Sequence, residues 1–420
     1  MTHRVFAATA AAVVSILLQP TATAVQPNAS TLIRNVMVFD GNQKSRSPVN
    51  VLIAGDAIVR VTADALAADG REVVDGKGRV LMPGLIDSHM HSSGNPNAFR
   101  QQALFGVTSS VGMWGAAPAE EKLLSIPEIR AVYKTAARGA TVPGGHGDEE
   151  RRSPVTVSDA SDADAFVEAR FTQGSDFLKI ILGPPNLPML SEATTKALID
   201  AAHKRGRMAV AHVDGLKEAK MAVRLGIDAL VHVFCDAAAD DPLIRDMVSR
   251  RVFLVPTLTI RQGRIEAAWP WRGNAQSLLD NQAIAPMLSA EERRKISETT
   301  EGNSDCRQIA ATNVARFNKA GVIVLAGSDA ANPGTAWGAS LHQELQLLVG
   351  AGLSPHAVLH AATAAPAERF GWTDRGRIAP GLRADLLLLE CDPTSDIRCT
   401  ARIGAVWQGG RRIERVAAGH

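Results

Sequence analysis

The chain has 420 residues, of which 46% are hydrophobic and 21% are charged. This composition is typical of globular proteins and excludes a fibre or a disordered chain. The 45 basic and 43 acidic residues are interspersed and give a net charge of +2. Charge therefore gives no reason to expect a nucleic acid or an anionic membrane as a partner.

The first 24 residues show the three-part pattern of a secretory signal. A basic residue, Arg4, precedes an apolar stretch from Val5 to Leu18, and Ala22-Thr23-Ala24 provides small residues for cleavage. The alternative is a membrane anchor, but the apolar stretch is shorter than the about 20 residues that a spanning helix needs. The sequence predicts a signal peptide over residues 1–24, export to the periplasm or the medium, and no stable membrane insertion.

Residues 25–82 alternate short apolar runs with Asp-Gly and Gly-Lys-Gly turns, which predicts β-strands. Residues 83–370 alternate short apolar runs with helix-like stretches, which favours a parallel sheet covered by helices. Residues 371–420 become β-like again. We therefore expect an α/β fold: a (β/α)₈ TIM barrel over residues 83–370, with a small β-sandwich formed by the two flanking segments. The third barrel strand is expected within TAARGATV, residues 135–142.

A polar, helix-like insertion covers about residues 260–313, between the seventh and eighth predicted strands. Trp269 and Trp271 lie in its early part. Loops that follow barrel strands form the mouth of the barrel, so this segment is either a substrate-binding lid or a solvated surface hairpin.

The four cysteines matter because an exported protein meets an oxidising compartment. Cys391 and Cys399 enclose a short polar loop, and we expect them to form a disulfide. The spacing leaves open whether Cys235 and Cys306 pair or remain buried as small apolar groups.

Two histidines end the apolar run LIDSHMH, residues 85–91. In a β-strand, positions i and i+2 point to the same side, so His89 and His91 share a face that would be the barrel interior. Two core imidazoles side by side would each need a polar partner. A metal site answers that need more simply than two separate structural roles.

Lys179 lies in the middle of the apolar run FLKIIL. Burial lowers the pKa of a lysine toward the neutral amine, which can take up carbon dioxide as a carbamate. The carbamate is a two-oxygen anion able to bridge two metal ions. The alternative is a lysine that extends to the barrel rim.

Three further polar residues stand near the carboxyl ends of predicted strands: His212 after MAVA, His232 within ALVHVF, and Asp329 after VIVLAGS. Strand ends converge on one face of a barrel. Imidazole and carboxylate groups gathered there suit zinc.

Together these motifs resemble the amidohydrolase superfamily, in its binuclear branch with a carboxylated lysine, and especially its prolidase-like and imidazolonepropionase-like members. The resemblance runs from VLMPGLIDSHMH through AGSDA to the closing DRGRIAPGLRADLLLLECDP. It implies two Zn²⁺ ions, or other divalent metals, with His89, His91 and Asp329 on one ion, His212 and His232 on the other, and carboxylated Lys179 bridging both.

The resemblance also implies a hydroxide between the metals as the nucleophile, with Asp329 as general base and acid. His146, in VPGGHGD, resembles a substrate-loop histidine that lies over the carbonyl being cleaved; the alternative is a solvent-facing turn residue. Other candidate substrate contacts are Arg152, Arg261, Arg264, Trp269 and Trp271. Prolidase-like enzymes commonly carry His-Ala-Tyr at the fifth strand, whereas this chain has His212-Val213-Asp214, which weakens the case for dipeptides.

The leading hypothesis is an exported binuclear zinc hydrolase that cuts a C–N amide bond in a dipeptide-like, N-acyl amino acid or aryl amide substrate. A second hypothesis keeps the metals but has a lactone, ester or phosphoester as substrate. A mononuclear deaminase is disfavoured because that branch does not need Lys179, and an exported metal- or solute-binding barrel is disfavoured because a pure binder does not need Asp329. The expected partner is a small-molecule substrate, and the sequence leaves a homo-oligomer open.

Overall fold

The computed structural model describes residues 30–92, 94–95, 97–115, 132–149, 155–261, 276–297 and 304–415. The predicted signal peptide over residues 1–24 lies outside this range, as do Arg152, Arg264, Trp269 and Trp271. Of Arg261, only the backbone is described.

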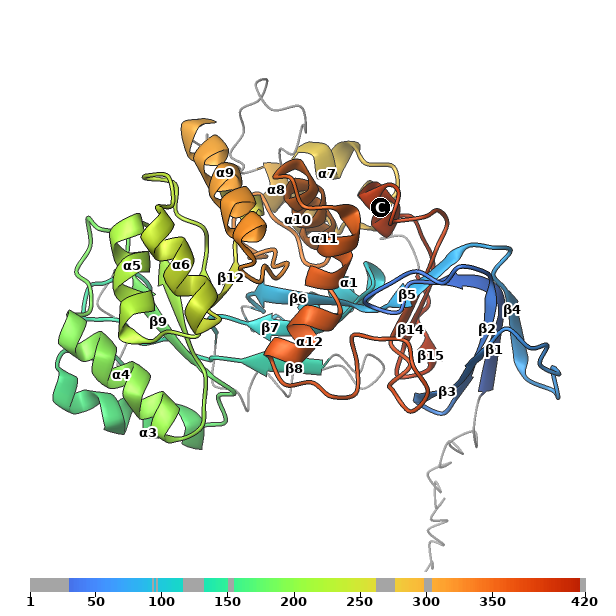
Figure 1. The fold of residues 1–420 in the computed structure, drawn as a ribbon, viewed down its shortest axis with the longest axis horizontal. Helices are drawn as coiled ribbons and strands as arrows, with labels where there is room; N and C mark the ends of the chain where they lie inside the picture. Colours follow the sequence, from blue (N-terminus) through green and yellow to red (C-terminus); the bar gives the residue numbers. More distant parts are fainter. Residues whose placement is uncertain are drawn as a thin grey trace, which may run out of the picture.

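An eight-stranded mixed sheet joins the two ends of the described chain (Figure 1). Its main path runs β15-β14-β13-β5-β1-β2-β3, and β4 pairs with β1. The strands are β1 (Ser30–Val38), β2 (Val49–Ala54), β3 (Ala57–Thr62), β4 (Glu72–Asp75), β5 (Val80–Pro83), β13 (Leu386–Leu389), β14 (Ile403–Gln408) and β15 (Arg411–Arg412). The strands before and after the central part of the chain therefore share one sheet, with β13 antiparallel to β5.

Strand β13 shows why this sheet is bound to the rest of the molecule. Its sequence is Leu-Leu-Leu-Leu, and all four side chains are buried. Leu387 and Leu389 pack into the large core of the molecule, whereas Leu386 and Leu388 pack into a second core with Trp407. A strand that is apolar at every position is expected where both faces of a sheet are covered.

The central part of the chain contains two parallel sheets. One has the order β6-β7-β8, with strands β6 (Leu85–Met90), β7 (Val107–Gly112) and β8 (Val132–Thr135). The other has the order β12-β11-β10-β9, with strands β9 (Leu178–Leu182), β10 (Ala209–Val213), β11 (Ala229–Val231) and β12 (Phe253–Val255). The third strand, β8, begins three residues before the predicted run and overlaps it only at Thr135.

Isolated bridges connect the edges of the two parallel sheets. Ala140 bridges to Ile180 in β9, Leu254 in β12 bridges to Val324, and Ala330 bridges to Met90 in β6, all in parallel orientation. The sheets of the described residues do not form a continuous closed barrel, so the barrel remains a prediction and the α/β class is what the structure supports.

The predicted eighth strand, residues 322–329, forms no ladder of its own. Its backbone shares hydrogen bonds with several neighbours: Leu325 donates to the carbonyl of Leu254, and Ala326 donates to that of Ala361. The segment continues to Asp329, whose φ of +52° is not a strand conformation.

Helices surround the parallel sheets, and some of them also lie close to the mixed sheet (Figure 1). They are α1 (Asn97–Leu104), α3 (Ala163–Thr172), α4 (Glu192–Lys204), α5 (Leu216–Leu225), α6 (Asp241–Arg250), α7 (Gln276–Asp280), α8 (Ala290–Ser297), α9 (Ser304–Ala320), α10 (Ala339–Gly350), α11 (Pro355–Ala361) and α12 (Ala364–Arg369). Short 3₁₀ turns are η1 (Ala160–Asp162), η2 (Leu258–Arg261), η3 (Ala285–Met287) and η4 (Ile397–Ala401).

The sequence sets these helix limits by local chemistry. Helix α4 begins after Ser191, whose hydroxyl accepts a hydrogen bond from the backbone of Thr194, and α6 begins after Asp240, which accepts from Leu243. Helix α5 ends at Leu225 and is capped by Gly226, whose φ of +101° suits glycine. No helix in the described ranges is long and apolar enough to cross a membrane.

Both cysteine pairs form disulfides. Cys391 is bonded to Cys399, as the short loop predicts. Cys235, which follows β11 closely, is bonded to Cys306 in α9, the pairing that the sequence left open.

Candidate metal centre

The candidate ligands of β9 and β10 face away from the helices. Alternate residues of these two strands pack into the large core: Leu178, Ile180, Leu182, Ala209, Ala211 and Val213. Lys179 and His212 therefore point to the opposite side, because side chains alternate along a strand. The parallel register pairs Lys179 with Val210, two residues before His212.

His89, His91 and Asp329 form the tightest cluster, with ligand atoms all within 4.8 Å of one another. Asp329 Oδ1 lies 3.1 Å from Nε2 of His89 and 2.7 Å from Nε2 of His91. Burial lowers the pKa of His89 to about 3. Burial alone would raise the pKa of Asp329, but the adjacent imidazoles hold it well below its usual range. Neutral imidazole and ionised carboxylate are the forms that bind metal.

Two further imidazoles continue the cluster. The ring centre of His232 lies 4.8 Å from that of His89 and 4.4 Å from that of His212. His232 and Asp329 both adopt a left-handed backbone, with φ of +67° and +52°. A left-handed backbone is strained in residues other than glycine, and such strain is concentrated at functional sites.

Lys179 is 2% exposed, and burial lowers its pKa to about 8. The carboxylates of Asp329 and Asp214 act in the opposite direction, which places both close enough to interact with the amine. A pKa near 8 leaves a fraction of neutral amine at neutral pH. The sequence predicted such a lowered pKa, and carboxylation of Lys179 stays a prediction.

Hydrogen bonds at Nδ1 orient the rings of His91 and His232. His91 Nδ1 lies 3.1 Å from the carbonyl oxygen of Trp114, which can only accept, so Nδ1 carries the proton and Nε2 is free toward Asp329. His232 Nδ1 lies 2.7 Å from the hydroxyl of Thr257. Partners of this kind fix the ring and the tautomer of a metal-binding histidine.

His212 is oriented by a carboxylate that the sequence reasoning did not include in the site. Its Nε2 lies 2.8 Å from Oδ2 of Asp214. The sequence spacing could have indicated this contact. Asp214 follows His212 by two residues, and residues i and i+2 of an extended chain point to the same side.

The carboxylate of Asp87, two residues before His89 in β6, links this strand by hydrogen bonds to the segment that carries Asp329. It accepts hydrogen bonds from the backbone of His89 and from both the backbone and the hydroxyl of Ser328, at 3.1, 3.0 and 2.6 Å. Burial raises its pKa to about 6 despite these donors. Asp87 thereby holds the two parts of the cluster in register.

This donor set fits a metal centre. Nε2 of His89 and Nε2 of His91 are 3.3 Å apart, and both approach one carboxylate oxygen of Asp329. Four imidazoles, a carboxylate and a lysine with a lowered pKa are the ligand types that zinc and similar divalent ions prefer. The set is continuous, since the ring of His232 lies between those of His89 and His212 and its Nδ1 is 3.9 Å from Oδ2 of Asp329.

His146 lies at the rim of the cluster. Its ring centre is 5.0 Å from that of His212, and Nδ1 is 2.7 Å from Oε1 of Glu149. The side chain is 42% exposed, so it can reach a molecule bound above the metal ligands. The structure thus brings His146 next to the predicted ligands, while its role in substrate binding stays a prediction.

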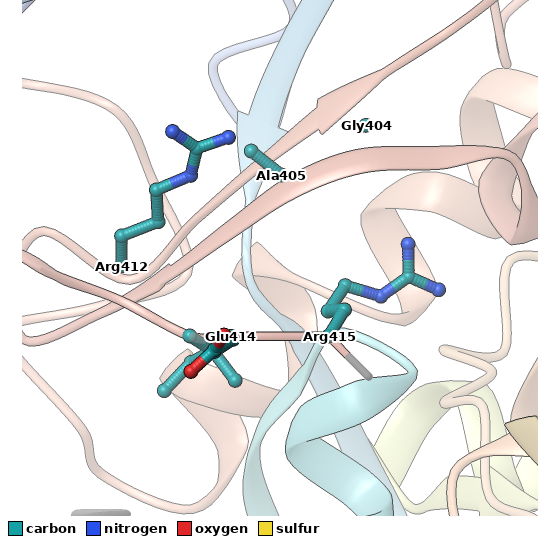
Figure 2. Close-up of a pocket in the computed structure, with 6 residues that line it drawn as sticks. Gly404, Ala405, Arg412, Glu414 and Arg415 are labelled. Atoms are coloured by element: carbon teal, nitrogen blue, oxygen red, sulfur yellow. The ribbon is translucent and has the colours of Figure 1, made fainter. Parts of the chain in front are cut away.

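A surface pocket of about 330 Å³ lies elsewhere, along β14 and the segment after β15 (Figure 2). It is lined by Gly404, Ala405, Arg412, Ile413, Glu414 and Arg415. Its arginines have partners within the fold, since Arg412 pairs with Glu72 and Arg415 donates to the carbonyl of Leu104. The pocket contains none of the candidate ligands, and we do not assign the substrate to it.

The model of the Amidohydrolase family matches residues 80–413, which include every candidate ligand. The chain belongs to the amidohydrolase family. The resemblance read from the sequence is thereby confirmed.

Individual relatives of this amidohydrolase are distant. It is 25% identical over 405 residues to an adenine deaminase of Methylobacterium sp. (strain 4-46), covering 93% of this chain but only 59% of the deaminase. It is 24% identical over 409 residues to an imidazolonepropionase of Streptomyces griseus, covering 86% and 92% of the two chains. A solved Xaa-Pro dipeptidase superposes with a TM-score of 0.72 at 18% identity, over 92% of this chain and all of that one, which supports the fold alone.

Proposed function

We propose that the protein is an exported, binuclear zinc hydrolase that cleaves a C–N amide bond in a small molecule. The observation that carries the proposal is the continuous row of imidazoles from His91 through His89 and His232 to His212, with Asp329 against one end. Family membership supports metal-dependent hydrolysis. The relatives named as deaminase and imidazolonepropionase support a C–N bond as the target.

In this proposal, His89, His91 and Asp329 hold one ion, His212 and His232 hold the other, and carboxylated Lys179 joins them. When bound, two divalent ions supply a water of lowered pKa and polarise the bond under attack. Asp329 is the base that accepts the proton of the attacking water and returns it to the leaving nitrogen. It suits this task because its carboxylate is ionised and lies against the ligand nitrogens of His89 and His91.

The substrate is proposed to enter from the side of His146, where an exposed imidazole can donate a hydrogen bond to the carbonyl oxygen under attack. Glu149 fixes this ring, because its carboxylate accepts the proton on Nδ1. Nε2 then donates to the carbonyl oxygen only when the ring carries a second proton. N-acyl amino acids and aryl amides are the favoured substrate classes. Dipeptides are less favoured because Asp214 stands where prolidase-like enzymes carry a tyrosine.

Export is part of the proposal and rests on the amino-terminal pattern of residues 1–24. The two disulfides, Cys235–Cys306 and Cys391–Cys399, support it, since stable disulfides are characteristic of oxidising compartments. We also propose that the parallel strands and their bridges represent a (β/α)₈ barrel, with the mixed sheet as part of a sandwich beside it.

The decisive experiment combines a substrate panel with metal analysis. Zinc-loaded wild-type protein is assayed on N-acyl amino acids, dipeptides, aryl amides, lactones and aryl phosphoesters. We expect hydrolysis of at least one amide. Turnover confined to lactones, esters or phosphoesters would replace the amide proposal with the second hypothesis, and no turnover with two bound ions would favour a metal-binding role.

The matched pair Lys179→Met and Lys196→Met tests the centre itself. Lys179 is buried, whereas Lys196 is an exposed residue of helix α4 and pairs with Asp200. Loss of metal and activity is expected only for Lys179→Met. Two tightly bound zinc ions and full activity in that variant would contradict the bridging role.

A further inference from the structure

The hydrogen bond between His212 and Asp214 is unlike those of the other oriented ligands. His91 is held by the carbonyl of Trp114 and His232 by the hydroxyl of Thr257, both neutral groups. His212 is held by a carboxylate. Of these three ligands, His212 is therefore the one whose orienting partner is a carboxylate.

The backbone around Asp214 is shaped to admit this contact. Gly183, at the end of β9, has a φ of +137°, and a Cβ on it would lie 2.7 Å from Oδ2 and 3.0 Å from Cβ of Asp214. Any larger residue at position 183 would push Asp214 away from His212. The carboxylate is also only 21% exposed, so water screens its interaction with the ring only in part.

An ionised carboxylate can only accept hydrogen bonds, so the proton of the neutral ring must sit on Nε2 of His212. The lone pair is then on Nδ1, the nitrogen that faces away from Asp214. A carboxylate in this position also makes the opposite nitrogen a better electron donor to a metal. Its charge reaches Lys179 as well, since Asp214 is one of the two carboxylates that act on that amine.

We propose that Asp214 is a positioning residue that fixes His212 with Nδ1 toward the metal, and that its charge strengthens selectively the ion held by His212 and His232. This inference rests on the proposed binuclear centre. It explains why this chain has an aspartate at this position: the residue acts on the ligand set rather than on the substrate. Loss of such a partner typically weakens metal affinity about 10- to 100-fold.

The test measures metal affinity directly. Metal-free wild-type protein, Asp214→Asn, Asp214→Val and the control Asp236→Asn are titrated with Zn²⁺ against a chromophoric chelator. Asp236 is a matched control because it also follows a neighbouring strand, β11, and its carboxylate accepts only from the backbone of Leu216 among the bonds described. The amide oxygen of asparagine can keep the hydrogen bond to His212 without the charge, whereas valine keeps neither.

We expect wild type and Asp236→Asn to bind two ions equally well. In Asp214→Val, one ion should bind about 10- to 100-fold more weakly while the other is unchanged, and Asp214→Asn should lie between. Unchanged affinity for both ions in Asp214→Val would overturn the inference, as would equal losses in Asp214→Asn and Asp214→Val. Failure of the proposed function would look different, because wild-type protein itself would not bind two ions.

Discussion

Glu344 offers a test of the electrostatics of the buried core next to the candidate metal centre. It lies on α10, is fully buried, and accepts hydrogen bonds from the backbone nitrogens of Leu258 and Thr259 at 3.0 and 2.9 Å. These two residues follow Thr257, whose hydroxyl holds His232. Burial raises the pKa of Glu344 from 4.5 to about 8, and the two backbone donors oppose this shift without cancelling it.

The direction of the pH effect follows from this shift. Between about pH 4.5 and about pH 8 the folded protein keeps a proton on Glu344 that the unfolded chain releases. The stabilising contribution of the group is therefore complete below pH 4.5 and is lost as the pH rises through about 8. One proton corresponds to about 1.4 kcal/mol per pH unit, so the loss between about pH 6 and pH 7.5 is about 2 kcal/mol.

The Glu344→Gln variant cannot titrate. Its amide nitrogen would also face a backbone donor, which lowers the free energy of unfolding by about 1–3 kcal/mol at every pH. The free energy of unfolding of wild type falls over this range, whereas that of the variant lacks this contribution. The difference between the two should therefore become smaller by about 2 kcal/mol between about pH 6 and pH 7.5. Asp87, with a pKa of about 6, completes its ionisation within this range, but it does so in both proteins, so its own titration is removed by the comparison.

Urea unfolding of metal-free protein gives the free energy of unfolding of wild type and Glu344→Gln at each pH. The change with pH in the difference between the two proteins isolates Glu344, because groups that titrate alike in both proteins cancel. Glu390→Gln is the control, because Glu390 is 43% exposed and pairs with Arg79 at the surface. Parallel pH dependence in wild type and Glu344→Gln would refute the reasoning. It would mean that the backbone donors, rather than burial, decide the charge of this carboxyl.

Three further changes test the site and its frame. Asp329→Asn removes the proposed base but leaves His212 and His232, so turnover should fall by about 10²- to 10⁴-fold with at least one ion kept and KM little changed; a rate near wild type would show that the base lies elsewhere. Gly327→Ala places a methyl group 2.9 Å from Cβ of His89, which should cost about 1–3 kcal/mol and reduce metal content; a fully loaded variant with an unchanged Tm would contradict this. Replacing Cys391 and Cys399 by serine opens a short loop and should lower the free energy of unfolding by about 2 kcal/mol, measured by thermal unfolding without reductant, where an equal Tm would count against the disulfide as a stabilising link.

Much of the fold and the ligand cluster could be predicted because both depend on local periodicity. The spacing of His89 and His91 predicted that their side chains share one face of a strand, and in the structure their Nε2 atoms are 3.3 Å apart. The sequence likewise predicted β structure within residues 371–420, and β13, β14 and β15 lie there. These features need only the period-two geometry of a strand.

The parts that failed or stayed open depend on contacts between distant segments. Residues 322–329 looked like a strand, but their hydrogen bonds are divided among several partners, which no local pattern reveals. The pairing of Cys235 with Cys306 joins positions 71 residues apart and needed the placement of α9. Asp214 was visible as a departure from a motif, but its bond to His212 required side-chain positions.

The pairing of β5 with β13 has a consequence for synthesis of the chain. β13 pairs with one edge of β5, but the ribosome synthesises β13 about 300 residues after β5. At about 5–20 residues per second, this delay is roughly 15 to 60 seconds. During that time the strand Val-Leu-Met-Pro, fully buried in the finished protein, has one open edge that could pair with another chain. A chain cut short before Leu386 would keep this edge open permanently, so we expect truncated products to aggregate instead of accumulating as folded fragments.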